Sequence, residues 1–428
     1  MTTTFFNRRD GELYVEDLSV AEIARQEGTP VFIYSQTALR VAFEALDKAF
    51  SAVPHTVCFA IKSNMNLAVV RTLVDCGAGV DVTSGGELFR ALRAGADPQK
   101  IVYSGVGKTD AEVDEALDAG IRFFNLESRA ELGCVNARAA ARGVVANITF
   151  RVNPDVDPKT HPYISTGLKN SKFGIPIAEA RDAYAEAKTL DSVKTVGVDC
   201  HIGSQLTDAQ PFHDALLRVR SLVEDLRNAG HEISYLDCGG GLGVVYKDEE
   251  PPSPEEYAKA ILDAVGDLGC EIVLEPGRWI TANAGLMVTE VVYEKNNGGK
   301  TYTIVDGAMT DLLRPALYQA YQHIEPVGPA RGEERIVDIV GPVCESGDFL
   351  AKERPFPPVE KGDYIAVFSA GAYGFSMSSN YNGRRRAAEV LVCGDRYSVV
   401  RARESYEDLI RGENLGETLD ESLDEESA

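Results

Sequence analysis

Eight short β-rich runs alternate with amphipathic helical patterns between residues 57 and 278, and this alternation constrains the fold of the 428-residue chain more than any other feature. The runs cover residues 57–61, 79–83, 101–104, 122–126, 147–152, 195–201, 233–237 and 271–274. Strands that alternate with helices pair in parallel, and eight such units close a TIM-type β/α barrel. A doubly wound open sheet is the alternative architecture.

After Gly285 the pattern changes to strand-like runs without strong helical signals, which predicts a C-terminal β-sandwich or β-barrel domain. The expected strands cover residues 287–293, 301–305, 335–341, 363–368, 388–392 and 397–402. We therefore expect an N-terminal segment that pairs with the β domain (1–35), a barrel (36–285), the β domain (286–410) and an acidic, disordered tail (411–428).

Charge, hydropathy and cysteine spacing exclude several classes of protein. Acidic residues outnumber basic ones 66 to 43, giving a net charge of −23, which disfavours nucleic acid and anionic membrane as partners. No apolar stretch approaches the length of a membrane span, and the first dozen residues lack a secretory hydrophobic region. The eight cysteines show no C-x-x-C spacing, so neither a metal site nor a disulfide framework is expected. These features predict a cytoplasmic protein.

Lys62 directly ends the first barrel strand, at the face where β/α barrels place their active sites. A lone lysine there is more often a side chain that snorkels to solvent. Desolvation at the barrel mouth would lower the pKa of its amine and make it a candidate to form a Schiff base. Asp81 in the second strand and His201 after the sixth reach the same face. An isolated histidine is usually a satisfied core residue, and His201 is otherwise a candidate ligand, base or stacking ring.

A run of glycines, Cys238-Gly239-Gly240-Gly241-Leu242-Gly243, follows the seventh strand, and its backbone amides suit a phosphate group. Glycine clusters also form ordinary turns, and a dinucleotide loop would look similar, although the G-x-G-x-x-G spacing is missing. Glu275-Pro276-Gly277-Arg278 ends the eighth strand and supplies a guanidinium suited to an anion. A salt-bridged strand end is the alternative reading of this motif.

Taken together and in this order, these motifs resemble the fold type III pyridoxal-phosphate decarboxylases, whose barrels are like that of alanine racemase. Gly341-Pro342-Val343-Cys344-Glu345-Ser346-Gly347-Asp348 belongs to the same pattern. Within that group the chain is similar to the diaminopimelate decarboxylases. This narrower resemblance depends on the motif at residues 161–168 with Lys172-Phe173-Gly174, on Cys344-Glu345, and on Met377-Ser378-Ser379-Asn380-Tyr381-Asn382.

The resemblance implies roles for individual residues around pyridoxal 5'-phosphate. Lys62 would bind the cofactor covalently, His201 would stack on its ring, and Glu275 would pair with the ring nitrogen. Asp81 would support the lysine or the ring. The phosphate would contact Ser204, Gly240, Gly241, the Gly277–Arg278 region and Tyr373.

The same resemblance implies a substrate with an amino-acid group at its far end, namely meso-diaminopimelate, converted to L-lysine and carbon dioxide. The expected substrate-binding residues are Arg278, Arg314, Tyr318, Glu345 and Tyr373. Cys344 would protonate or shield the reacting carbon. The Cys344-Glu345 loop would enter the neighbouring subunit's site, so a homodimer is expected. A related decarboxylase of arginine, ornithine or a D-amino acid, an alanine-type racemase and a non-catalytic homologue are the alternatives.

Overall fold

The computed structural model, which describes residues 5–156 and 171–416, contains a closed barrel of eight parallel strands. The order around the barrel is β9-β11-β12-β13-β5-β6-β7-β8, and a β8–β9 pairing closes it. The strands are β5 (His55–Ala60), β6 (Gly79–Val82), β7 (Ile101–Tyr103), β8 (Phe123–Leu126), β9 (Ala146–Asn153), β11 (Val193–Asp199), β12 (Tyr235–Asp237) and β13 (Glu271–Leu274). The predicted barrel is therefore confirmed, and the open-sheet alternative is wrong.

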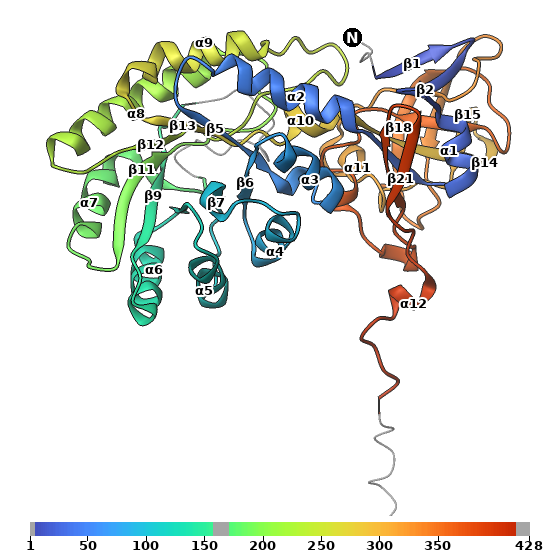
Figure 1. Cartoon of the computed structure of the whole chain (residues 1–428). Coiled ribbons are helices and arrows are strands. Elements are labelled where there is room, and N and C mark those ends of the chain that lie inside the picture. Colours follow the sequence, from blue (N-terminus) through green and yellow to red (C-terminus); the bar gives the residue numbers. More distant parts are fainter. Residues whose placement is uncertain (1–4, 157–170, 417–428) are drawn as a thin grey trace, which may run out of the picture.

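Helices surround the barrel (Figure 1), and their buried apolar residues form one core cluster with those of its strands. They are α2 (Gln36–Ala49), α3 (Leu67–Asp75), α4 (Gly85–Arg93), α5 (Asp110–Ala119), α6 (Arg129–Arg142), α7 (Ile177–Ala187), α8 (Gln210–Asn228) and α9 (Pro254–Val265). Their starts follow from local chemistry, since Ser84 and Ser128 cap α4 and α6, and Thr109 forms a capping box with Glu112 in α5. The left-handed glycines Gly120 and Gly143 end α5 and α6.

Nine further strands form a second sheet with the order β18-β17-β15-β14-β4-β20-β21, and β19 and β16 extend it from β14. Its members are β4 (Val31–Ser35), β14 (Gly285–Asn297), β15 (Lys300–Val305), β16 (Ile324–Pro326), β17 (Arg335–Val340), β18 (Phe349–Phe356), β19 (Tyr364–Val367), β20 (Ala388–Cys393) and β21 (Arg396–Arg401). The N-terminal β4 lies between two C-terminal strands, antiparallel to β14 and parallel to β20. Strands β16 and β18 were not predicted.

Shorter elements complete the chain. A three-stranded sheet of β1 (Phe6–Arg9), β2 (Glu12–Val15) and β3 (Leu18–Ser19) precedes α1 (Val20–Glu27). The barrel also carries β10 (Ile175–Pro176) and α10 (Arg278–Thr281), whereas α11 (Arg314–Tyr318) and α12 (Tyr406–Leu409) belong to the C-terminal part. Within the described residues, none of the helices combines the length and apolarity that a membrane crossing needs.

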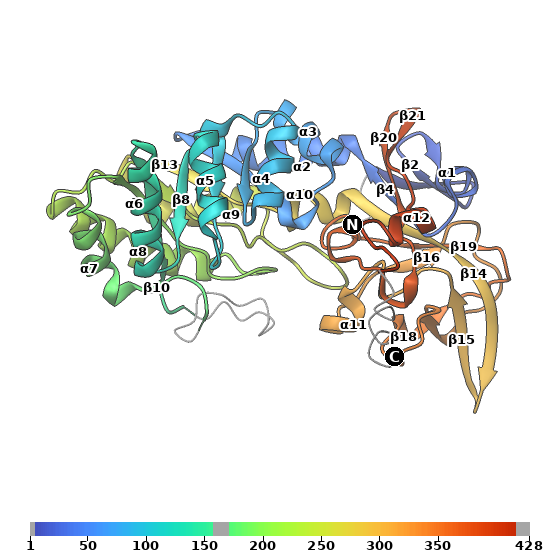
Figure 2. The same ribbon diagram turned by 90° about the horizontal axis from the view of Figure 1, so that it is seen from below.

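The barrel and the β-rich part lie side by side along the long dimension of the molecule (Figures 1 and 2). Direct hydrogen bonds join them beside Lys62, because Tyr373 N–H donates to the Ser63 carbonyl at 2.8 Å and Asn64 Nδ2 donates to the Gly371 carbonyl at 3.0 Å. Gly371 permits this approach, since a Cβ there would lie 1.9 Å from the Thr281 carbonyl oxygen. This contact between the barrel and the β-rich part therefore brings residues from both parts to the carboxyl ends of the barrel strands.

Candidate active site

A cavity of about 490 Å³ opens at the carboxyl ends of the barrel strands, beside the β-rich part. This volume is in the range of sites for small molecules and cofactors. Ten of the residues predicted from the sequence line it: Lys62, His201, Ser204, Gly241, Glu275, Gly277, Arg278, Arg314, Tyr318 and Tyr373.

Lys62 lies in a short 3-10 turn directly after β5, and its amine faces the fully buried Asp81 of β6. The Lys62 Nζ to Asp81 Oδ2 distance is 2.5 Å, and the lysine side chain keeps 40% of its surface exposed because it faces the cavity. The other carboxylate oxygen of Asp81 is buried and has no hydrogen-bond partner among the described residues. Asp81 therefore fixes the amine and keeps one acceptor unused.

The expected lowering of the Lys62 pKa is wrong. Burial acts in that direction, but the negative charges of Asp81 and Glu275 outweigh it and raise the pKa of the Lys62 amine. In the cofactor-free protein Lys62 is therefore an ammonium paired with Asp81. The amine must transfer a proton before it can act as a nucleophile.

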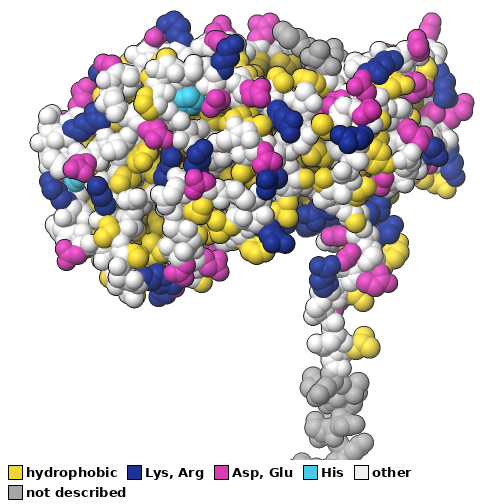
Figure 3. Space-filling view, viewed as in Figure 1, with side chains coloured by type: hydrophobic (Ala, Val, Ile, Leu, Met, Phe, Trp, Pro, Cys, Tyr) yellow, Lys and Arg dark blue, Asp and Glu magenta, His cyan; other side chains and the backbone are white. Residues whose placement is uncertain are grey.

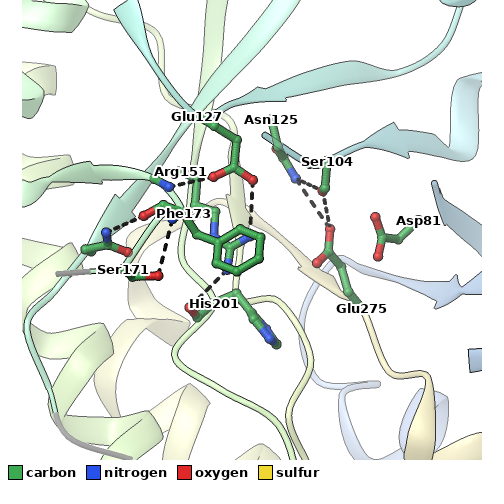
Figure 4. Close-up of polar contacts among 12 residues, drawn as sticks. Asp81, Ser104, Asn125, Glu127, Arg151, Ser171, Phe173, His201 and Glu275 are labelled. Carbon is green, nitrogen blue, oxygen red and sulfur yellow. Dashed lines mark hydrogen bonds and ion pairs between the residues drawn. The ribbon is translucent and has the colours of Figure 1, made fainter. Parts of the chain in front are cut away.

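Glu275 ends β13 and joins a buried polar network inside the barrel (Figure 4). Its Oε1 accepts from Ser104 Oγ at 3.2 Å and from Asn125 Nδ2 at 3.4 Å, and Asn125 Nδ2 also donates to Asp237 Oδ2 at 3.0 Å. Burial and the neighbouring Asp81 raise the pKa of the Glu275 carboxyl to about 7. Glu275 is thus a buried acid that is only partly ionised near neutral pH, and its negative charge is favoured by neighbouring cations such as Lys62.

His201 follows β11 and carries a neutral imidazole. Burial, together with the positive charges of Arg151 and Lys62, lowers the pKa of His201 well below its usual range. The Gly240 N–H donates to Nδ1 at 3.2 Å, which makes Nδ1 the acceptor nitrogen. An uncharged aromatic ring held by backbone is suited to stacking on a flat heteroaromatic ring.

The glycine run holds its backbone against two neighbouring segments. A Cβ on Gly240 would lie 2.2 Å from the Glu275 carbonyl oxygen, and one on Gly241 would lie 2.5 Å from that of Gly203. Gly241 lines the cavity, whereas the Gly240 amide is engaged with His201. Glycine is required here because the backbone approaches too closely for a side chain.

Comparison with known proteins identifies the group to which this site belongs. The model of the pyridoxal-dependent decarboxylase family, pyridoxal binding domain, matches residues 36–282. The diaminopimelate decarboxylase of Pseudomonas aeruginosa is 51% identical over 410 residues, which cover 96% of this chain and 99% of that protein. The chain belongs to the diaminopimelate decarboxylase family.

Solved structures of diaminopimelate decarboxylases share the fold. The Helicobacter pylori enzyme, complexed with L-lysine, is 42% identical, with a TM-score of 0.89 over 91% of this chain and 98% of that chain. The M. jannaschii enzyme, also in complex with L-lysine, is 38% identical, with a TM-score of 0.91 over 96% and 98% of the two chains. The cofactor is pyridoxal phosphate, and the amine, carboxyl group and neutral imidazole around the cavity are a donor set that fits it.

Two buried arginines approach the cavity in this decarboxylase family member. Arg278, in α10, donates from Nη2 to Ser204 Oγ at 3.2 Å, and its guanidinium carbon lies 4.8 Å from the centre of the Tyr373 ring. Arg314, which starts α11, is 6% exposed. Two guanidinium groups at one cavity form a site for a carboxylate or phosphate.

Cys344 and Glu345 do not line the cavity of their own chain. Both are exposed on a loop of the β-rich part, where the Cys344 N–H donates to Asn382 Oδ1 at 2.9 Å. The motif at residues 161–168, which supported the narrower resemblance, lies outside the described residues.

Sequence reasoning missed several side chains of this diaminopimelate decarboxylase site. Arg151 of β9 forms a buried ion pair with Glu127 at 3.2 Å and lies 4.7 Å from the Phe173 ring centre (Figure 4). Ser104 and Arg151 also line the cavity. The available signal was an arginine between Phe150 and Val152 in a predicted barrel strand, because a buried charge in a strand requires a partner.

Proposed function

We propose that this chain catalyses decarboxylation of meso-2,6-diaminopimelate to L-lysine and carbon dioxide. Because meso-diaminopimelate has one D and one L centre and L-lysine keeps the L centre, the lost carboxylate is that of the D centre. The main support for this activity is that Lys62, His201 and Glu275 line one cavity beside two buried arginines. The family to which the chain belongs supports the same activity.

In this proposal the chain's own residues bind and orient the cofactor. Lys62 supplies the amine that attaches it, after passing its proton to a neighbouring group, and Asp81 keeps that amine in place. Glu275 would pair with the ring nitrogen, and His201 would stack on the ring. The residues that would hold the phosphate are Ser204, Gly241, Gly277, Arg278 and Tyr373, which line the cavity, together with Gly240 of the glycine run. When bound, pyridoxal phosphate supplies an electron sink for the electron pair left by the departing carboxylate.

The far end of the substrate carries a carboxylate and an ammonium group. Arg278 and Arg314 are assigned to the carboxylate, with Tyr318 and Tyr373 completing the wall of the cavity. Binding there would orient the substrate so that the D centre lies at Lys62.

The proposal includes a homodimer in which each subunit completes its partner's site. Support comes from the exposed position of Cys344 and Glu345, away from their own cavity. Glu345 would take the distal ammonium, and Cys344 would protonate or shield the reacting carbon. We further infer the domain division at residues 35, 285 and 410. A cytoplasmic location fits the eight cysteines, all of them described and unpaired.

The test is incubation of the holoenzyme with meso-diaminopimelate, with assay of L-lysine and carbon dioxide. Lys62→Ala should fold but lose turnover and covalent cofactor attachment, because Lys62 is the one lysine that lines the cavity within residues 5–156 and 171–416. Borohydride treatment of the wild type should fix the cofactor on the peptide that contains Lys62. Lys100→Ala, whose amine bonds the Gly77 carbonyl at the surface, is the matched control and should remain active. Label on another lysine, or turnover of arginine or ornithine in place of meso-diaminopimelate, would overturn the proposal.

A further inference from the structure

Tyr246 lies behind the cavity wall and has no role in the site described so far. It follows the glycine run and is 6% exposed, packed in an apolar cluster with Val244, Ala282 and Ala372. It does not line the cavity. A buried tyrosine hydroxyl normally has a hydrogen-bond partner, and here that partner is charged.

Tyr246 contacts both arginines of the site through different parts of its side chain. Its hydroxyl oxygen accepts from Arg278 Nη1 at 2.7 Å. Its ring faces the guanidinium of Arg314, with 4.2 Å between the guanidinium carbon and the ring centre. The second Arg278 nitrogen, Nη2, donates to Ser204, so the plane of this guanidinium is fixed from two sides.

Two buried guanidinium groups of like charge repel each other. Burial and the charge of Arg278 both lower the pKa of Arg314, which shows that the two cations interact. A hydrogen bond to a charged donor and a desolvated cation–π contact are among the stronger polar interactions in proteins. Tyr246 makes the hydrogen bond with Arg278 and the cation–π contact with Arg314. It therefore holds the two guanidinium groups together against their repulsion and fixes the distance between them.

We propose that Tyr246 is a positioning residue that sets the spacing of Arg278 and Arg314 and thereby selects ligands whose far end carries a carboxylate. The inference rests on the proposed function, in which these arginines bind the distal carboxylate. It extends that function, because a residue outside the cavity determines part of the specificity.

The test compares Tyr246→Phe, which keeps the ring and removes the acceptor, with Tyr246→Leu, which removes both. Because the distal contact is made equally in the ground state and the transition state, KM for meso-diaminopimelate should rise about 10-fold in the first variant and about 100-fold in the second, with kcat within about threefold of wild type. Tyr257→Phe is the control, because this buried ring packs on Phe212 and Phe50, away from the arginines, and its KM should not change.

Binding to the holoenzyme without turnover gives a second readout. L-Lysine keeps the distal carboxylate and 1,5-diaminopentane lacks it, so Tyr246→Phe should weaken L-lysine binding about 10-fold and leave diaminopentane binding unchanged. A parallel loss of both affinities, or an unchanged affinity for L-lysine in an active enzyme, would overturn the role of Tyr246. A wild type that fails to turn over meso-diaminopimelate would instead overturn the proposed function and this inference with it.

Discussion

At the scale of single residues, the carboxyl group of Glu275 shows how its surroundings set its charge. It is 7% exposed and shares the barrel interior with Asp81, Asp199 and Asp237, which are all buried. Burial raises the pKa of Asp199 and of Asp237 well above the usual range, and the charge of Glu275 adds to the effect. In the cofactor-free site these buried carboxyl groups therefore stay protonated at pH values where carboxyl groups on the surface are ionised.

This environment predicts a pH dependence for Glu275→Gln in the cofactor-free protein. The pKa of Glu275 rises from 4.5 to about 7 on folding, so its ionisation opposes folding. Below pH 4.5 the carboxyl is protonated in both states and costs nothing. As the pH rises through 7 the cost grows to about 3 kcal/mol, which the neutral glutamine avoids. The variant should therefore gain stability over wild type between pH 4.5 and 7, with little further gain above that range.

Urea unfolding of both proteins at several pH values measures this difference. The same series on cofactor-loaded protein should show a smaller gain, because the ring nitrogen then stabilises the carboxylate of wild type. A stability difference that is constant from pH 4.5 to 8 would contradict the assignment of a buried, protonated Glu275.

At the scale of elements, the glycine run depends on the contact between Gly240 and the end of β13. Gly240→Ala places a methyl group against the Glu275 carbonyl, so it should destabilise the protein by about 1–3 kcal/mol and weaken cofactor binding. Gly133→Ala is the matched control. Gly133 lies inside α6 with no atom within 4 Å of an added Cβ, so alanine should stabilise by about 0.5–1 kcal/mol. Thermal unfolding and cofactor titration check both, and equal effects would refute the contact argument.

Helices and strands with a strong local hydrophobic pattern were predictable from the sequence, and strands without such a pattern were not. The eight barrel strands are short, mostly buried runs that alternate with amphipathic helices, so their existence follows from the sequence. Strand β18 was missed because Lys352, Glu353, Arg354 and Pro355 interrupt its alternation, and a proline is unusual within a sheet. Its pairing with β17 depends on tertiary contacts that propensity does not describe.

The site shows the same limit. Lys62 and Glu275 stand at strand ends, where barrel chemistry is expected. The direction of the Lys62 pKa shift depends on carboxylates contributed by β6 and by the end of β13, and local sequence does not reveal their distance from the amine. Asn125 and Tyr246 look like ordinary strand and loop residues, and their contacts appear only in the folded protein.

At the scale of the whole molecule, shared active sites make a prediction about mixed dimers. Lys62→Ala and Glu345→Ala homodimers should each be inactive, but a heterodimer would contain one site with both wild-type residues. Free assortment of equal amounts should restore about a quarter of wild-type sites. Tagged chains establish subunit exchange and allow heterodimers to be purified. Inactive heterodimers would place Lys62 and Glu345 of one chain in the same site.

The face of the molecule drawn in Figure 3 is compatible with this association despite the net charge of −23. Acidic and basic side chains are interspersed over the face in Figure 3, so no single-sign patch dominates it. Because the charges are interspersed, two copies repel each other mainly through their net charge. Salt screens this long-range repulsion.

The place of β4 in the second sheet has a consequence for protein synthesis. Residues 31–35 leave the ribosome early, but of their two partner segments residues 285–288 are translated first and residues 388–392 much later. At about 5–20 residues per second, roughly 20 to 70 s separate residues 31–35 from residues 388–392. During that time at least one edge of β4 (Val-Phe-Ile-Tyr-Ser), which is fully buried in the folded protein, is exposed to other nascent chains. The barrel can form as its helices emerge, whereas this sheet closes only near the end of translation.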